Sequence, residues 1–308
     1  MRIATAHTFD ASLAQLQRRQ KALGEAQEQL TSGKRVLRAS DDPAAAAAAE
    51  RALSTLSRSD AQQRALDASR AATQLAESSL GEAGALLQQA RELLVGAGNG
   101  SYNDADRSSL GQVIAGLRGD LLALANRRDS DGRYIFGGQG SDGPPLQDGP
   151  GGVGFNGTPG QATTAAGAAA PLSVDGRAVW LRADDPALPG QALSVFDVMD
   201  RVASELMTPG RSQAEVAATV SRGLAEIDAS SANLSTWRTR TGETLNRLDA
   251  LSDQVSQEAL DAREARSAAE DLDMVQAISD FQSRQSGYDA ALKTYSIVQR
   301  MSLFDYLR

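Results

Sequence analysis

The sequence predicts a mainly α-helical protein: an elongated antiparallel helical rod or bundle built from the N- and C-terminal segments, with a small β-rich domain inserted between them. Three observations support this fold class. Both ends of the 308-residue chain are rich in Ala, Leu, Gln and Arg, apolar residues recur there at helical spacing, and the middle is rich in Gly and Pro. We predict terminal coiled-coil segments at 1–45 plus 272–308, a helical rod at 46–135 plus 193–271, and a β-rich domain at 136–192.

The first terminal segment has the pattern of a coiled-coil helix. Its apolar residues are spaced by 4, 3, 7 and 7 positions, and Gln20 and Gln27 fill the intervening positions of the heptad stripe. One such stripe cannot bury itself, so we expect it to need a partner helix. This predicted N-terminal seam comprises Phe9, Leu13, Leu16, Leu23 and Leu30.

The linker and cap motif that follows separates two helices. Thr31-Ser32-Gly33 ends the first helix, and Ser40-Asp41-Asp42-Pro43 has the residues of a helix start, with a capping side chain followed by proline at the first helical position. We expect the second helix to run towards Val95 and to end at Gly96–Gly100. A third helix, capped by Asn103 or Asp104, would return antiparallel to it.

The central region contains turn signals and short apolar runs. We expect short strands at 134–136 and 174–181, with Asp175-Gly176 as a hairpin turn. Gly152–Gly157 matches GxGxxG, but Thr158-Pro159-Gly160 cannot open the helix that a dinucleotide site needs, so we interpret these glycines as loop residues. After this region we expect a short helix from Val195 to Leu206, then long helical sequence to the C-terminus.

Composition argues against several classes of function. The net charge of −8 disfavours nucleic-acid binding, and no apolar stretch is long enough to span a membrane. The chain has no cysteine and one histidine, His7, so we expect no disulfide, no metal site, no cofactor and no catalytic role. The start of the chain has no apolar signal region, which by itself suggests the cytoplasm but leaves an export route without a cleaved signal open.

Three pairs of adjacent carboxylates are the candidates for catalytic groups. Neighbouring residues on a helix point apart, so they cannot share a proton as an acid–base pair. We interpret Asp41-Asp42 as capping residues, and Asp184-Asp185 and Glu270-Asp271 as solvated surface charge. Periodicity alone leaves two interpretations of the terminal stripes equally open: a seam for a partner, or the inner face of an ordinary bundle.

Both terminal regions resemble the bacterial flagellin superfamily. The resemblance lies in Leu30–Val36, Ala39–Ala45 and the tail from Ala291 to Leu307. Three details are more similar to the junction branch of that superfamily than to flagellins: Pro43 after Asp-Asp, the segment Asp131–Gly138, and the Leu-Phe-Asp-Tyr ending at 303–306.

This resemblance implies a structural subunit of the bacterial flagellum, not an enzyme. Such a subunit would join the hook, through the first hook-associated protein, to the flagellin filament, and would lie in a ring of its own copies. It would be extracellular, exported by the flagellar type III system without a cleaved signal peptide, and protected by an export chaperone. A filament subunit of the flagellin type is the alternative, and a helical-bundle adaptor or secreted effector is a more distant one.

The resemblance also assigns roles to residues. The motif Gly33, Ser40, Asp41, Asp42 and Pro43 would link inner and outer helical layers, and residues 136–192 would form a variable outer domain. The C-terminal seam, a surface for neighbouring subunits and for the chaperone, would comprise Ile278, Phe281, Tyr288, Leu292, Tyr295, Leu303 and Phe304.

Overall fold

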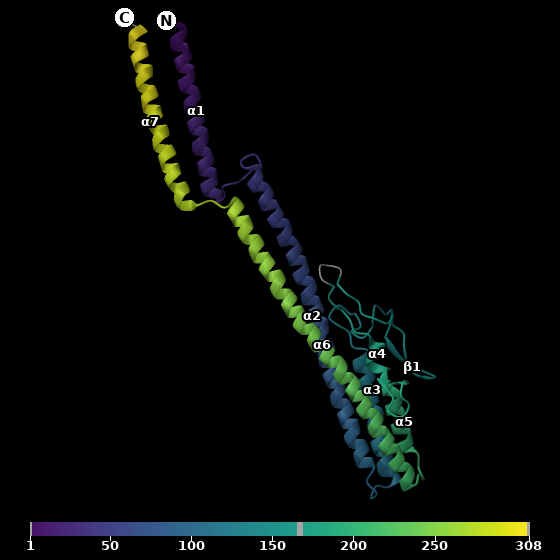
Figure 1. Ribbon diagram of the computed structural model, residues 1–308. Coiled ribbons are helices and arrows are strands. Elements are labelled where there is room, and N and C mark those ends of the chain that lie inside the picture. Colours follow the sequence, from purple (N-terminus) through teal and green to yellow (C-terminus); the bar gives the residue numbers. More distant parts are fainter. Residues whose placement is uncertain (1, 165–168, 307–308) are drawn as a thin grey trace. The chain divides into compact units, whose positions relative to one another are not determined.

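The computed structural model describes residues 2–164 and 169–306, and for residues 2–9 and 298–306 it describes the backbone only (Figure 1). The predicted mainly helical fold with a small β region is confirmed. The long helices are α1 (Arg2–Ser32), α2 (Pro43–Ala97), α3 (Asp104–Ala125), α5 (Val195–Met207), α6 (Gln213–Glu270) and α7 (Met274–Tyr306). The central region adds the short helix α4 (Gly176–Trp180) and four strands: β1 (Leu146–Gly149), β2 (Gly152–Phe155), β3 (Ala183–Asp184) and β4 (Ala192–Leu193).

The chain forms two compact units. The first contains Met1–Ser59 and Gln257–Arg308, and the second contains Asp60–Ser256. Helices α2 and α6 contribute residues to both units, because each is longer than 50 residues. The three-part division proposed from the sequence stays a prediction.

In the first unit, α1 and α7 pack side by side. They run antiparallel, so that the first turn of α1 and the last turn of α7 lie at the same end of the pair (Figure 1). At the other end, the loop after α1 lies against the short segment that joins α6 to α7, and these two segments form an antiparallel bridge between Lys34 and Asp271.

The second unit has a continuous hydrophobic core. Helix α2 contributes Ala76, Leu80, Ala83, Leu87, Ala90 and Leu94, all of them buried. Their spacing of 4 and 3 places them on one face, and the alternating alanines allow a neighbouring helix to approach closely. Helices α3, α5 and α6 cover this face, with α3 beginning at a capping box between Asn103 and Asp106.

The central region differs from its predicted strands. No strand forms at 134–136 or at 174–181 among the described residues, and Asp175 is a helix cap instead of a turn residue: its side chain accepts a hydrogen bond from Ala178 N at 3.2 Å to start α4. The reason is tertiary packing, because Phe136 and Trp180 are buried edge to face with ring centroids 5.2 Å apart. The GxGxxG glycines are also not all in a loop, since Gly152–Phe155 forms β2, which pairs antiparallel with β1.

Arg118 of α3 holds the β1–β2 hairpin against the helices. Its guanidinium pairs with Asp148 of β1 and with Asp200 of α5, and it lies 5.7 Å from the centre of the Phe196 ring. The Arg118 side chain is only 13% exposed, so these charge-assisted bonds form in a partly desolvated position. In the part of the chain that the structure describes, no helix has the length and apolar character that a bilayer crossing requires.

Candidate assembly site

The predicted N-terminal seam is only partly covered along α1. Leu16, Leu23 and Leu30 are half-buried, whereas Leu13 is 40% exposed and Gln20 and Gln27 are exposed. The one fully buried residue among the described side chains of α1 is Ala26, which the heptad pattern did not single out. The side chain of Phe9 lies outside the described residues. Part of the predicted stripe therefore meets α7, and part has no cover within the described chain.

The C-terminal seam divides in the same way. Phe281, Tyr288 and Tyr295 are half-buried, whereas Ile278 is 47% and Leu292 41% exposed. Arg284 supports the buried face by donating from Nη1 to the carbonyl of Ala22 in α1 at 3.0 Å. The side chains of Leu303 and Phe304 lie outside the described residues. Helix α7 thus has one face against α1 and a second apolar face exposed.

Sequence reasoning did not include the most exposed residue of this second face. Val275 is 83% exposed, and it precedes Ile278 by one helical turn. Ile278 and Leu292 are separated by 14 residues, or two heptads, so they lie on the same side of α7. The sequence holds a signal for this: Ile278 and Leu292 share one heptad position, whereas Phe281, Tyr288 and Tyr295 share another, so the two sets form separate stripes.

The loop after α1 and the segment before α7 form a clasp, which we define as residues 33–42 together with 269–273. Arg35 N donates to the carbonyl of Glu270 at 2.7 Å, and Leu272 N donates to the carbonyl of Gly33 at 3.0 Å. Gly33 has a φ of 70°, a left-handed conformation that ends α1 and favours glycine. These bonds fix the exit of α1 against the entry of α7.

Charged side chains strengthen the clasp. One of them, Glu270, was expected to be a solvated surface charge, and the structure contradicts this. Glu270 is not a solvated surface charge: its side chain is 15% exposed and pairs with Lys34 Nζ at 3.2 Å and with Arg266 Nε at 2.7 Å. Arg35 bonds to the carbonyl of Ala269 at 2.8 Å and to Asp42 at 3.1 Å. The sequence-based site contained only the first side of this clasp, because nothing local indicates that residues 34 and 270 meet.

The cap motif is formed by Asp41, Asp42 and Pro43. Asp41 Oδ2 accepts hydrogen bonds from the backbone of Leu37 and Arg38, and the Arg38 bond contributes most to lowering the pKa of this carboxyl. Asp42 Oδ1 accepts from Ala45 N at 3.0 Å, which, with the Arg35 guanidinium, lowers the pKa of Asp42. Pro43 is the first residue of α2. Ser40 is exposed, and its hydroxyl donates to Asp41 Oδ1 at 3.4 Å.

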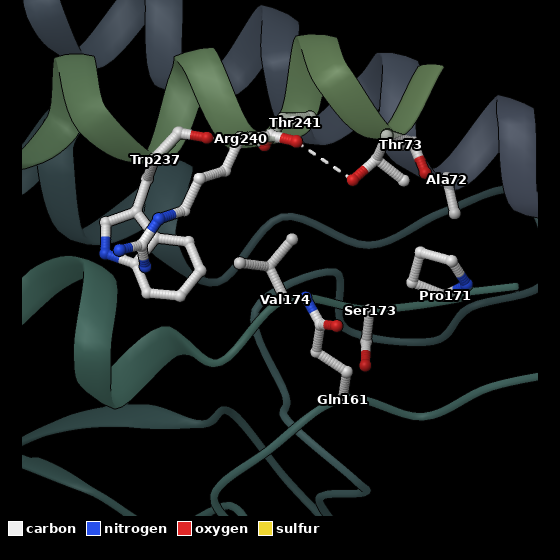
Figure 2. A pocket seen from close by; sticks show the side chains of 10 residues that line it. Ala72, Thr73, Gln161, Pro171, Ser173, Val174, Trp237, Arg240 and Thr241 are labelled. Carbon is white, nitrogen blue, oxygen red and sulfur yellow. Dashed lines mark hydrogen bonds between the residues drawn. The ribbon is translucent and has the colours of Figure 1, made fainter. Parts of the chain in front are cut away.

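A small pocket in the second unit lies between the helices and the central region, with a cavity volume of about 30 Å³ (Figure 2). Trp237, Arg240 and Thr241 line it from α6, Thr73 lines it from α2, and a loop containing Ser173 faces them. The hydroxyls of Thr73, Ser173 and Thr241 each donate to a backbone carbonyl. The pocket therefore presents packed, already bonded hydroxyls, and it does not offer an activated nucleophile with a base.

Comparisons with known proteins agree with the terminal motifs. Residues 3–141 match the bacterial flagellin N-terminal helical region. Flagellar hook-associated protein 3 of Salmonella typhimurium is 30% identical over the full length of both chains. Flagellar hook-associated protein 3 of Escherichia coli K12 is 32% identical over 90% of each chain. Both of these relatives are hook-associated proteins, which favours the junction interpretation over the filament alternative.

A solved structure supports the fold. The chain aligns with a putative flagellar hook-associated protein from Vibrio parahaemolyticus with a TM-score of 0.64, covering 75% of this chain and all of the other, at 22% identity. The two sequence relatives, which cover 100% and 90% of the chain, carry the family assignment, and this structure supports the helical architecture. The chain belongs to the flagellar hook-associated protein 3 family.

Proposed function

We propose that this chain joins the flagellar hook to the filament by packing its terminal helices against neighbouring subunits. Membership of its family makes it a structural component of the bacterial flagellum with a role at the hook–filament junction. The finer proposal concerns its partners: the first hook-associated protein on one side, flagellin on the other, and copies of itself in a ring. The observation that carries it is the second apolar face of α7, formed by Val275, Ile278 and Leu292.

This face is notable because the α1–α7 pair has a thin core. Among the side chains described for α7, from 274 to 297, none is fully buried, and among those described for α1, from 10 to 32, Ala26 is the single fully buried one. Two helices stabilised by so little burial gain most of their stability from further partners, since burial is the dominant favourable term in association. The proposal therefore predicts that α1 and α7 become well protected only in the assembled junction.

The clasp gives the assembled helices a defined attachment. Its backbone bonds between Gly33, Arg35, Glu270 and Leu272 hold the two helix ends together. Arg35 and Asp42 connect the clasp to the first turn of α2. We propose that this motif transmits the position of the α1–α7 pair to the long helices.

Export and protection complete the proposal. The weakly buried α1–α7 pair can unfold for passage through a narrow export channel at small cost in free energy, because these two helices have little packing to lose. We propose export by the flagellar type III system without a cleaved signal peptide. An export chaperone would cover the exposed face of α7 before export, because exposed apolar faces favour aggregation.

The central experiment uses paired charge substitutions on the two sides of α7. In a strain that lacks the gene, the double variant I278D/L292D is expected to leave hooks present but to release flagellin into the medium instead of retaining a filament. The matched control is S283D/A290D, which adds the same charge to exposed positions of the same helix. The control is expected to restore filaments and swimming.

Two outcomes would contradict the proposal. If I278D/L292D restores filaments as well as the control does, the second face of α7 is not an assembly surface. If truncation of residues 275–308 still restores filaments, the terminal helix as a whole has no role at the junction. Secretion of the I278D/L292D protein is measured in the same cultures, so that a failure of export is distinguished from a failure of assembly.

A further inference from the structure

Two Asn-Gly dipeptides occur in the chain, and the structure places them in contrasting surroundings. Asn99-Gly100 lies in the loop between α2 and α3, and Asn156-Gly157 follows β2. In such a pair the backbone nitrogen of the glycine can attack the side-chain amide carbon of the asparagine, because glycine has no Cβ to block the approach. Whether this happens depends on the freedom of the backbone and on the polarisation of the amide.

The amide of Asn99 is polarised by two donors. Its Oδ1 accepts a hydrogen bond from Ser101 N at 3.1 Å and another from Ser101 Oγ at 3.0 Å. As the glycine nitrogen attacks, negative charge develops on this oxygen. Two preorganised donors stabilise such a charge in the same way as the donors of an oxyanion hole. Ser101 therefore activates the amide of its own loop.

The surroundings of the attacking nitrogen of Gly100 are open. Within the described residues its N–H makes no hydrogen bond, and a Cβ built at this position would meet only the end of the Gln213 side chain, at 3.6 Å. Asn99 itself is exposed, and Gly98 precedes it. The turn is closed by Tyr102 N, which donates to the Asn99 carbonyl at 3.1 Å. Turning the Gly100 nitrogen towards the Asn99 amide therefore opens this one exposed turn, and it meets no steric block.

Asn156 has the opposite surroundings. Its backbone N–H is bonded to the carbonyl of Pro145 at 2.7 Å, and Thr158 N, two residues on, is bonded to Gly140 at 3.0 Å. The Cβ position of Gly157 lies 2.7 Å from the carbonyl oxygen of Gly137 and from the Phe155 ring. No donor to the side-chain amide of Asn156 is found in the described chain. The backbone on both sides of this pair is held, so the attack geometry is out of reach.

We infer that Asn99 is a site of spontaneous modification in the folded protein and that Asn156 is protected. The Gly100 nitrogen forms a bond to Asn99 Cγ, the C–N bond of the amide breaks, and ammonia leaves with the proton lost by Gly100. The resulting five-membered imide is then opened by water at either carbonyl. The products are aspartate, or isoaspartate with one extra carbon in the main chain.

The modification changes the end of the second unit where α2 stops and α3 begins. It adds one negative charge next to the C-terminal end of α2, where the helix dipole disfavours an anion. Asp104 and Asp106 already lie nearby in the first turn of α3. Isoaspartate also lengthens the loop just before the Asn103 cap. Modified molecules therefore accumulate with age and carry a weakened α2–α3 connection.

The experiment is incubation of the full-length folded chain in mildly alkaline buffer, followed by peptide mapping with mass spectrometry. Conversion is recognised by a gain of one mass unit, and isoaspartate by its separate elution. We expect Asn99 to convert at least about tenfold faster than Asn156, equivalent to about 1.4 kcal/mol in barrier. The same chain unfolded in urea is expected to convert both sites at similar rates, which shows that the folded structure causes the difference.

Two variants test the assigned roles. Gly100→Ala is expected to suppress conversion at Asn99, and Ser101→Ala is expected to slow it severalfold while circular dichroism stays unchanged. The inference is overturned if Asn156 converts as fast as Asn99 in the folded chain, or if Asn99 stays intact while the unfolded chain reacts. An unchanged rate in Ser101→Ala would overturn the activating role of the hydroxyl.

Discussion

Substitution by alanine is expected to destabilise the second unit at Gly111 and to stabilise it at Gly116. Both lie in α3, but Gly111 is buried where α3 meets α5, whereas Gly116 is exposed. A Cβ at Gly111 would lie 2.9 Å from the carbonyl oxygen of Ala203 and 2.8 Å from Met207 Cγ. A Cβ at Gly116 would meet nothing within 4 Å outside its own helix.

The magnitude follows from comparing the two variants. Glycine in a helix interior is about 1 kcal/mol less favourable than alanine, so Gly116→Ala is expected to stabilise the second unit by roughly that amount. Gly111→Ala has the same gain in propensity but also forces α3 and α5 apart, and overpacking costs about 1–3 kcal/mol. The difference between the two variants removes the propensity contribution and isolates the steric cost, about 2 kcal/mol.

Tryptophan fluorescence is a suitable assay because both tryptophans, Trp180 and Trp237, belong to the second unit. With a denaturant dependence of about 2 kcal/mol per molar urea, the two midpoints are expected to differ by about 1 M. Gly119→Ala, also at an open and exposed position of α3, is a second control and should resemble Gly116→Ala. The reasoning is refuted if Gly111→Ala is as stable as Gly116→Ala, because α3 and α5 would then not be in close contact.

Four further outcomes are expected. Asn103→Ala removes the cap of α3 and should lower the stability of the second unit by about 1 kcal/mol in urea. Arg118→Ala should lower the stability of the second unit by only about 1–2 kcal/mol, because its carboxylate partners are half exposed and regain water when the guanidinium is removed. It should also increase amide exchange in β1 and β2, which lose their link to α3. The pKa of Asp42 is lowered in the folded chain, so its stabilising contribution is present above the ordinary value of 3.8 and is lost as the pH falls through the lower folded pKa. The protection of the Ala45 amide, measured against its intrinsic exchange rate at each pH, should therefore fall on strong acidification, and constant protection down to pH 2 would contradict this. Burial, and less strongly Asp200, raises the pKa of Asp197, so its contribution is lost as the pH rises, and Asp197→Asn should gain stability relative to the parent chain from pH 3 to pH 7.

Much of the helical architecture could be predicted because its determinants are local. Pro43 and Asn103 stand at helix starts through chemistry confined to one turn, and the stripe from Leu110 to Leu124 shows its period directly. The central region could not be predicted in this way. Asp175-Gly176 has the residues of a hairpin turn, but the burial of Phe136 and Trp180 against the helices favours a capped helix.

The candidate site was only partly predictable for a related reason. A heptad pattern identifies which residues are apolar on α7, but two adjacent stripes overlap in sequence, and only the position of α1 separates the covered one from the exposed one. The clasp is even harder to predict from the sequence. Lys34 and Glu270 are 236 positions apart, and such a pairing follows from the path of the whole chain.

The clasp also determines how this molecule would carry mechanical load. The α1–α7 pair is joined to the long helices by two linkers, residues 33–42 and residues 271–273. The two linkers are bridged at Lys34 and Asp271. Tension on the pair is therefore shared by two linkers in parallel. A single cut within residues 37–40, on the exposed side of the loop, would leave α7 covalently attached and α1 held by its bonds to α7 and to the segment around Glu270. We therefore expect a subunit with one of its two linkers cut to stay attached through the other.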